Sequence, residues 1–150
     1  LRPMCELLKI RSPYKESINI LGSIQQPQVC SLLQESDIFT QHNITGEITH
    51  QTESLGASIL EAMSYALPVV GTKNGGVVET VVDGVTGILN EPGDVEAQAD
   101  AFLELARNPE LRQKMGDAAV QLAAAIGYAG GTPRSRSPRR WRRDRGCGDR

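Results

Sequence analysis

Residues 53–79 read ESLGASILEAMSYALPVVGTKNGGVVE, and the spacing of apolar residues in this stretch decides the fold class. Between residues 57 and 66 the apolar side chains recur at the three- and four-residue intervals of a helix. The next run, Leu67 to Gly71, is typical of a buried strand that is entered through proline. A Gly-Gly turn and a short helical segment at residues 77–82 follow. The stretch therefore predicts a helix, a strand and a second helix in close succession.

The same alternation continues on both sides of this stretch. Short runs rich in apolar or β-branched residues predict further strands at residues 18–24, 38–40 and 85–89. Helical patterns predict helices from Pro27 to about residue 36, from Asp94 as N-cap to residue 108, and from residue 110 to 126. Strands that alternate with helices in this way predict an α/β fold: a Rossmann-like, doubly wound parallel sheet with helices on both faces.

Two loops deserve most weight for function because each follows a predicted strand and precedes a predicted helix. They are residues 41–54 and residues 73–76. In a doubly wound sheet, ligands bind beyond the carboxyl ends of the strands, so we expect both loops to lie at that edge. His42 and His50 fall in the first loop. They either position a substrate or act as acid–base groups, or they are solvated histidines, which is the simpler interpretation. Lys73 opens the second loop and is either a positive charge near a phosphate or a solvated lysine.

Glu53 and Glu61 flank Gly56 in a way that suits an extended polar ligand. Eight residues of helix would separate their backbones by about 12 Å. Gly56 leaves amides uncovered at the expected start of a helix, where a phosphate binds readily. Carboxylates on either side could accept hydrogen bonds from hydroxyl groups, and a nucleotide-sugar carries a sugar, a diphosphate and a ribose in that order. From the spacing alone, however, two solvated charges on a helix face are the simpler interpretation.

The same residues resemble the signature of glycosyltransferase family 4, and the resemblance extends from about residue 18 to residue 124. The matching features, in order, are the Glu53–Glu61 pair, the Glu-Ala-Met that begins at Glu61, the Pro-Val-Val strand, the Gly-Gly-x-x-Glu turn that ends at Glu79, the stretch Asp83–Gly87, and the Asn-Pro-Glu-Leu that begins at Asn108. The resemblance implies part of the C-terminal, donor-binding domain of a retaining GT-B glycosyltransferase.

The resemblance also implies roles for single residues. Glu53 would hold hydroxyl groups of the donor sugar, Leu55 and Gly56 would offer amides to the diphosphate, and Glu61 would hold the ribose. Three further residues, which either approach the ligand or serve only the turn and the helix start, are Gly75, Gly76 and Glu79. For the two glycines we expect positive φ angles.

For the reaction, the resemblance implies a hexose that moves with retention from a UDP-sugar or GDP-sugar to a saccharide, lipid or small-molecule acceptor. No metal and no further cofactor would take part. The family's Gly-Arg and Lys-Gly residues, which neutralise the diphosphate, have no match in residues 1–17. The acceptor-binding N-terminal domain has none either. We therefore expect the chain alone to be inactive; a nucleotide-sugar-binding remnant without catalysis is the alternative.

Charge divides the chain into an acidic body and a basic tail. The formal net charge is -2, but residues 1–126 carry eight Lys or Arg against sixteen Asp or Glu, and residues 127–150 carry eight Arg against two Asp. The acidic body argues against nucleic acid as a partner. The Arg-, Ser- and Gly-rich tail predicts disorder, with a nucleic-acid-binding adaptor as a second hypothesis. We therefore divide the chain into a remnant of preceding sequence (1–17), an incomplete nucleotide-sugar-binding domain (18–126) and the tail (127–150).

The cysteines and the hydropathy bear on location. Cys5, Cys30 and Cys147 are odd in number and have neither CxxC spacing nor a nearby His cluster, so the sequence predicts neither a disulfide framework nor a zinc site. No run of about 18 apolar residues predicts a membrane span. We expect a cytoplasmic protein, with a parent enzyme that is either soluble or peripheral at the membrane.

Overall fold

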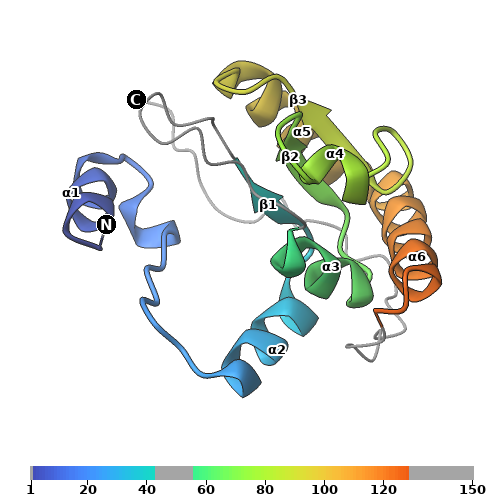
Figure 1. The fold of residues 1–150 in the computed structure, drawn as a ribbon. Coiled ribbons are helices and arrows are strands. Elements are labelled where there is room, and N and C mark those ends of the chain that lie inside the picture. Colours follow the sequence, from blue (N-terminus) through green and yellow to red (C-terminus); the bar gives the residue numbers. More distant parts are fainter. Residues whose placement is uncertain (1, 43–55, 129–150) are drawn as a thin grey trace. The chain divides into compact units, whose positions relative to one another are not determined.

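A computed structural model describes residues 2–42 and 56–128 of the chain (Figure 1). The chain divides into two compact units, Leu1–Leu32 and Leu33–Arg150. Within the described ranges, no helix is long and apolar enough to cross a membrane. The domain boundaries expected at residues 17 and 126 stay predictions, and the tail lies outside the described residues from residue 129 onward.

The first unit is helical and irregular. Helix α1 (Arg2–Arg11) is followed by the 3-10 helix η1 (Lys15–Ser17), and α2 (Gln26–Glu35) begins in this unit and ends in the next. The strand predicted at residues 18–24 is wrong, because this segment has no regular structure and Leu21 is 52% exposed. A strand needs a neighbour to bond its backbone groups, and no described residue pairs with this segment.

The second unit is built on a three-stranded parallel sheet. Its strands are β1 (Phe39–Gln41), β2 (Val69–Thr72) and β3 (Gly87–Asn90), in the order β1-β2-β3. Val69 of the central strand is aligned with Phe39 on one side and Gly87 on the other. All three strands lie within two residues of the positions that the sequence predicted.

Helices connect and cover these strands. Helix α3 (Ala57–Ser64) joins β1 to β2, α4 (Val77–Thr80) joins β2 to β3, and α5 (Val95–Arg107) and α6 (Pro109–Ala125) follow β3. The Asp94 side chain accepts a hydrogen bond from the Ala97 N–H and caps α5, as predicted. Asn108 caps α6 in the same way through the Leu111 N–H, with Pro109 at the first helical position.

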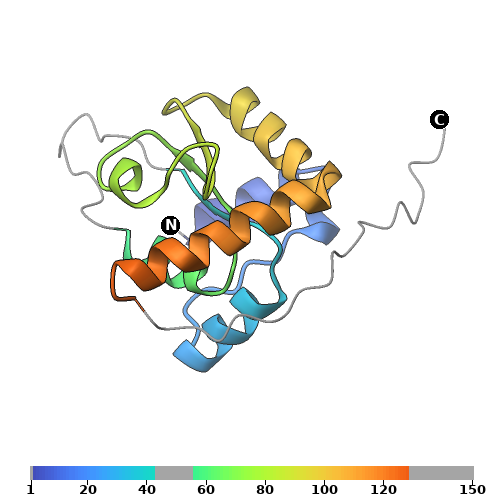
Figure 2. The same ribbon diagram turned by 90° about the vertical axis from the view of Figure 1, so that its right-hand side faces the viewer.

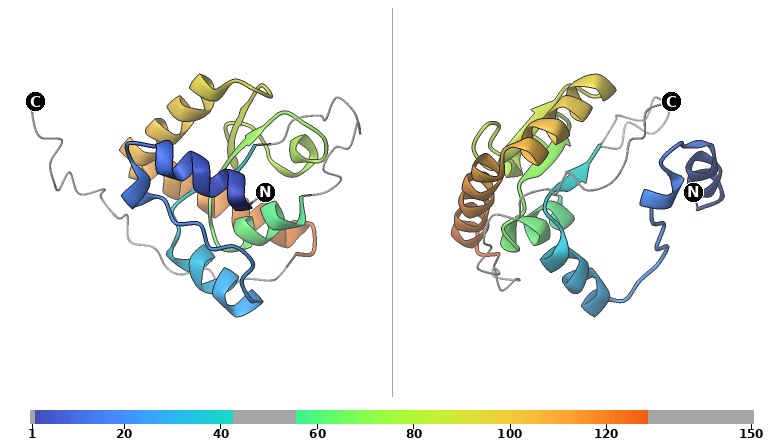
Figure 3. Two further views of the ribbon diagram at one scale, coloured as in Figure 1. Left: turned by 90° about the vertical axis from the view of Figure 1, so that its left-hand side faces the viewer. Right: turned by 180° about the vertical axis from the view of Figure 1, so that it is seen from behind.

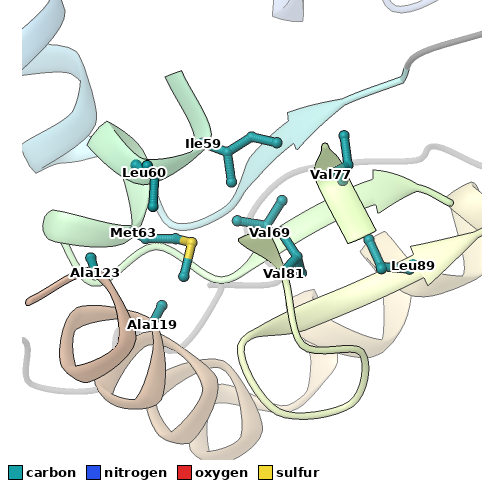
Figure 4. Packing of buried hydrophobic residues seen from close by; sticks show 9 residues of the cluster. All are labelled: Ile59, Leu60, Met63, Val69, Val77, Val81, Leu89, Ala119 and Ala123. Atoms are coloured by element: carbon teal, nitrogen blue, oxygen red, sulfur yellow. The ribbon is translucent and has the colours of Figure 1, made fainter. Parts of the chain in front are cut away.

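Successive residues of β2 face opposite layers of helices, which confirms the doubly wound arrangement. Val69 belongs to an apolar cluster with residues of α3, α4, β3 and α6 and with Val81, which follows α4. The cluster is shown in Figure 4 and contains Ile59, Leu60, Met63, Val77, Val81, Leu89, Ala119 and Ala123. Val70 belongs to a second cluster, with Ala101 and Leu105 of α5 and Met115 of α6. Helix α6 contributes to both clusters and lies beside α5 (Figures 2 and 3).

The contact between α3 and α6 depends on one glycine. Ala66 follows the end of α3 with a left-handed φ of 59°, and the N–H groups of Ala66 and Leu67 bond the carbonyls of Met63 and Ala62. The Ala66 carbonyl oxygen then lies against Gly116 of α6, so closely that a Cβ at residue 116 would overlap it. Glycine at this position therefore lets α6 approach the sheet.

A buried arginine fixes the turn between α5 and α6. Arg112 is 6% exposed, and one of its guanidinium nitrogens donates to the Leu105 carbonyl at 2.7 Å. Its Nε lies 4.0 Å from a carboxylate oxygen of Asp37, just before β1. A buried guanidinium needs such partners, so this residue serves the fold.

We expect Gly116→Ala to lower the free energy of unfolding by about 2 kcal/mol, because the new methyl group displaces α6 from the Ala66 carbonyl. On an unconstrained helix the same change would raise stability by about 1 kcal/mol, so the sign of the effect is diagnostic. Urea unfolding followed by circular dichroism measures it. Lys114→Ala, at an exposed position of the same helix, is the matched control. A stability gain for Gly116→Ala would refute the close contact.

Candidate functional site

The parallel strands bring three chain segments to one edge of the sheet. Strands β1, β2 and β3 end at Gln41, Thr72 and Asn90, and the segments that follow them start at the same edge. This is the edge where the sequence predicted the ligand. Of the first segment, residues 43–55 lie outside the described residues. The sugar-holding role of Glu53 and the amide of Leu55 therefore stay predictions.

Gly56 places the start of α3 at this edge. It has a left-handed backbone (φ 57°, ψ 53°), and its carbonyl accepts the N–H groups of Ile59 and Leu60. A Cβ here would lie 2.9 Å from Cδ1 of Ile59, so both conformation and space favour glycine. The Ser58 hydroxyl donates to Oε1 of Gln41 at 3.1 Å, which ties the first turn of α3 to the end of β1. No side chain of the described residues caps the helix.

Glu61 lies five residues along α3 from Gly56, about 7.5 Å down the helix axis. It is partly exposed, whereas Ile59 and Leu60 before it are buried in the core. The hydroxyl of Ser64 donates to the Glu61 carbonyl at 2.6 Å. The structure thus places a carboxylate residue one to two turns below an uncapped helix start.

The turn after β2 uses only one of its two glycines for a left-handed conformation. Gly75 has a φ of 54°, but Gly76 has a φ of -67°, so the positive φ predicted for Gly76 is wrong. Gly76 instead serves as the N-cap of α4, where an ordinary right-handed backbone suffices. Glu79 is exposed in the first turn of α4, and its N–H bonds the Gly76 carbonyl at 3.2 Å. The proximity of these three residues to a ligand stays a prediction.

An ion pair joins the turn after β2 to the segment after β3. The N–H of Lys73 donates to the Asn90 carbonyl at 2.8 Å, and Nζ of Lys73 lies 3.2 Å from Oε1 of Glu91. The two side chains are 44% and 69% exposed. Sequence reasoning considered Lys73 alone and missed Glu91, although both residues directly follow a strand, which was the available signal.

Asn90 is a buried polar residue that the sequence did not single out. It is 8% exposed, and its Nδ2 has no hydrogen-bond acceptor among the described residues. A buried amide donor without an acceptor costs roughly 1–3 kcal/mol. An Asn at the end of an apolar run is usually an exposed turn residue, so the sequence pattern did not predict that the Asn90 side chain is buried.

The start of α5 is tied to β1 by two side chains. Nε2 of His42 accepts a hydrogen bond from the Gly93 N–H at 3.2 Å, and Nε2 of Gln98 donates to Oγ1 of Thr40 at 3.1 Å. His42 therefore has a structural role and is not merely a solvated histidine. His50 lies outside the described residues.

The stretch Asp83–Gly87 stabilises β3 and does not belong to the edge described above. A carboxylate oxygen of Asp83 accepts the Leu89 N–H at 2.9 Å, and Gly84 turns the chain with a φ of 75°. Oγ1 of Thr86 accepts the Val82 N–H at 2.9 Å. A Cβ at Gly87 would overlap the Val69 carbonyl oxygen, so only glycine allows this strand to pair with β2.

Sequence comparison finds similarity to glycosyltransferases. The family described as "Glycosyl transferases group 1" matches residues 7–122. The chain is 32% identical over 115 residues to N-acetyl-alpha-D-glucosaminyl L-malate synthase of Bacillus anthracis, covering 77% of this chain and 28% of that protein. It is 31% identical over 131 residues to a sulfoquinovosyl transferase of Arabidopsis thaliana, covering 83% and 26%. The chain thus spans little more than a quarter of either relative.

Solved structures show the same fold. The C-terminal domain of a glycosyl transferase group 1 family protein from Francisella tularensis superposes with a TM-score of 0.70 at 25% identity, over 83% of this chain and 60% of that domain. An Anabaena protein, HepE, solved in complex with UDP, superposes with a TM-score of 0.71 at 23% identity, over 85% of this chain and 34% of that one. The fold is therefore that of the C-terminal domain of GT-B glycosyltransferases.

Replacement of Asn90 by leucine, which has nearly the same shape, should raise the free energy of unfolding by about 1 kcal/mol, because it removes the buried donor that lacks an acceptor. Thermal and urea unfolding of both proteins measure the change. Asn108→Leu is the contrasting control: it removes a helix cap and should lower stability by about 1 kcal/mol. A clear loss of stability in Asn90→Leu would show that the amide serves the fold.

Proposed function

We propose a function for this chain, which belongs to the glycosyl transferases group 1 family. The proposal is that residues 33–128 bind the nucleotide-diphosphate-sugar donor of a retaining hexosyltransferase. The observation that carries it is the uncapped, left-handed start of α3 at the carboxyl edge of the sheet, with Glu61 on the same helix. Bound UDP in the Anabaena structure supports a nucleotide as the ligand here.

The proposed roles are those that the family resemblance implies, and they agree with the order of groups in such a donor. The diphosphate would accept hydrogen bonds from the amides at Leu55 and Gly56, where the partial positive charge of the helix start also favours an anion. Glu61, one to two turns further along α3, would accept hydrogen bonds from the ribose hydroxyls. Glu53, on the other side of Gly56, would hold the donor sugar. Gly75 and Glu79, at the neighbouring strand end, are further candidates for the edge of this site.

The reaction itself is proposed for a larger protein. The chain covers 28% of the Bacillus anthracis relative and 26% of the Arabidopsis thaliana relative, so most of the length of these two proteins has no counterpart here. In the parent enzyme, a hexose would pass to a saccharide, lipid or small-molecule acceptor without a metal. A helix start stabilises an anion by only about 0.3–1 kcal/mol, which is a small part of what departure of a nucleoside diphosphate requires. We therefore expect binding, not turnover, from this chain.

A nucleotide-sugar-binding protein without catalysis is a second candidate. The observation that favours it is the scarcity of basic residues, because residues 33–128 hold four Lys or Arg against fourteen Asp or Glu. The two candidates differ once the chain is joined to an acceptor-binding domain from a relative. Sugar transfer by such a chimera would favour the enzyme. The cytoplasmic location stays a prediction from the cysteine pattern.

Isothermal titration of the 150-residue chain with UDP, GDP, UDP-glucose and GDP-mannose tests the donor site. We expect heat of binding with at least one of these nucleotides, because the site offers amides to the shared diphosphate. Circular dichroism must show that the sample is folded. A folded chain that binds none of the four would refute the proposal.

Glu61→Ala tests the ribose role. We expect it to weaken binding of UDP or GDP about tenfold, since a hydroxyl–carboxylate hydrogen bond contributes roughly 1.5 kcal/mol. Binding of inorganic pyrophosphate, which has no ribose, should stay unchanged. Glu104→Ala, an exposed position on α5, is the control for the loss of one negative charge. An equal effect of Glu61→Ala on pyrophosphate and on UDP would contradict a ribose contact.

A further inference from the structure

Positive charge is scarce in the unit that carries the candidate site. Between residues 33 and 128 the sequence holds fourteen Asp or Glu and only four Lys or Arg, namely Lys73, Arg107, Arg112 and Lys114. Arg107 ends α5, Arg112 is buried against α5 carbonyls, and Lys114 lies on α6. Lys73 is therefore the single lysine or arginine in this span that follows the carboxyl end of a strand.

Lys73 is placed within reach of the start of α3. It follows Thr72 at the end of β2, and two residues earlier Gly71 is aligned with Gln41 of β1. Gln41 in turn accepts the hydrogen bond from Ser58 in the first turn of α3. Adjacent strands lie about 4.8 Å apart, and a lysine has a flexible four-carbon stem that can cross such a spacing. The Lys73 ammonium can thus approach a phosphate that sits on this helix start.

The backbone of Lys73 is fixed while its side chain is not. The Lys73 N–H bonds the Asn90 carbonyl at 2.8 Å, so the Cα position is set by the sheet. Among the described residues, the ammonium group pairs with Glu91 alone, at 3.2 Å, and the two side chains are 44% and 69% exposed. An exposed pair of this kind contributes little net stabilisation, so a better anion can replace the carboxylate.

We propose that Lys73 is a ligand of the donor diphosphate and that Glu91 is its built-in competitor. Without donor, the Glu91 carboxylate holds the ammonium; with donor, a diphosphate oxygen takes its place and Glu91 turns to solvent. The inference rests on the proposed donor site and deepens it, because it assigns the phosphate-neutralising charge within this unit. The strength of the Lys73–Glu91 ion pair then helps to set the affinity for the nucleoside diphosphate, because this pair must break before Lys73 can bind the diphosphate.

The test is a double-mutant cycle read by titration with UDP, GDP and inorganic pyrophosphate. Because a charged contact at a partly exposed site contributes modestly, we expect Lys73→Gln to weaken binding about fivefold and Glu91→Gln to tighten it about threefold. The double variant should bind like Lys73→Gln alone, since Glu91 acts only through Lys73. Uridine and guanosine, which carry no phosphate, should bind all four proteins equally.

Two charge-matched controls make the cycle specific. Glu96→Gln removes a negative charge in the first turn of α5, for which the described part of the chain shows no ion pair, and Lys114→Gln removes a positive charge on α6. If Glu91→Gln and Glu96→Gln tighten binding equally, or if Lys73→Gln leaves binding unchanged, the inference about Lys73 is overturned. Nucleotide binding by the unaltered chain would still support the donor site in that case. Absence of binding in the unaltered chain and in Glu91→Gln would refute both.

Discussion

The second unit is organised around burial of the central strand on both faces. All four residues of β2 are buried, and Val69 and Val70 are fully inaccessible, one in each apolar cluster. Full burial of a valine contributes about 1.5–3 kcal/mol, so a strand of only four residues can hold two layers of helices in place. The same constraint excludes polar side chains from the middle of β2. Polar side chains appear at the end of the strand, at Thr72 and Lys73, and the connecting segments leave the sheet at this point.

The alternating elements of this unit were predictable because each carries its own periodic signal. The strands around Phe39, Val69 and Ile88 and the helices that begin at Ala57 and Asp94 all appear where the apolar spacing places them. The segment 18–24 failed for a physical reason: its apolar content fits a strand, but pairing depends on a neighbour that local sequence does not reveal. Within the candidate site, Gly56 and Glu61 were singled out through the family resemblance, because their spacing alone favoured solvated charges on a helix face. The Lys73–Glu91 pair and the buried Asn90 were missed, since such contacts join residues separated by 18 positions or arise only from burial.

The glycines of the family-like stretch divide into two physical classes, and the division affects what the resemblance can imply. Gly56 and Gly75 have left-handed backbones at the carboxyl edge of the sheet, where a ligand could approach their amides. Gly87 and Gly116 have no such role: each permits a backbone carbonyl, of Val69 or Ala66, to come closer than any Cβ allows. Asp83 likewise bonds the Leu89 N–H. Much of the recognisable signature therefore encodes packing, and it supports the fold more directly than it supports a particular donor.

The carboxyl edge combines fixed polar groups with one that can move. The His42–Gly93 and Thr40–Gln98 hydrogen bonds tie the start of α5 to β1, and the Ser58–Gln41 bond ties α3 to the same strand. Amides held in this way have little freedom to adapt, so they favour ligands whose phosphate groups already match their geometry. The Lys73 ammonium lies on a flexible stem in exposed surroundings and can follow charge over a range of positions. In a unit with so many carboxylates, the amides would set the geometry of a bound diphosphate, and the Lys73 cation would add a modest electrostatic attraction that follows the charge.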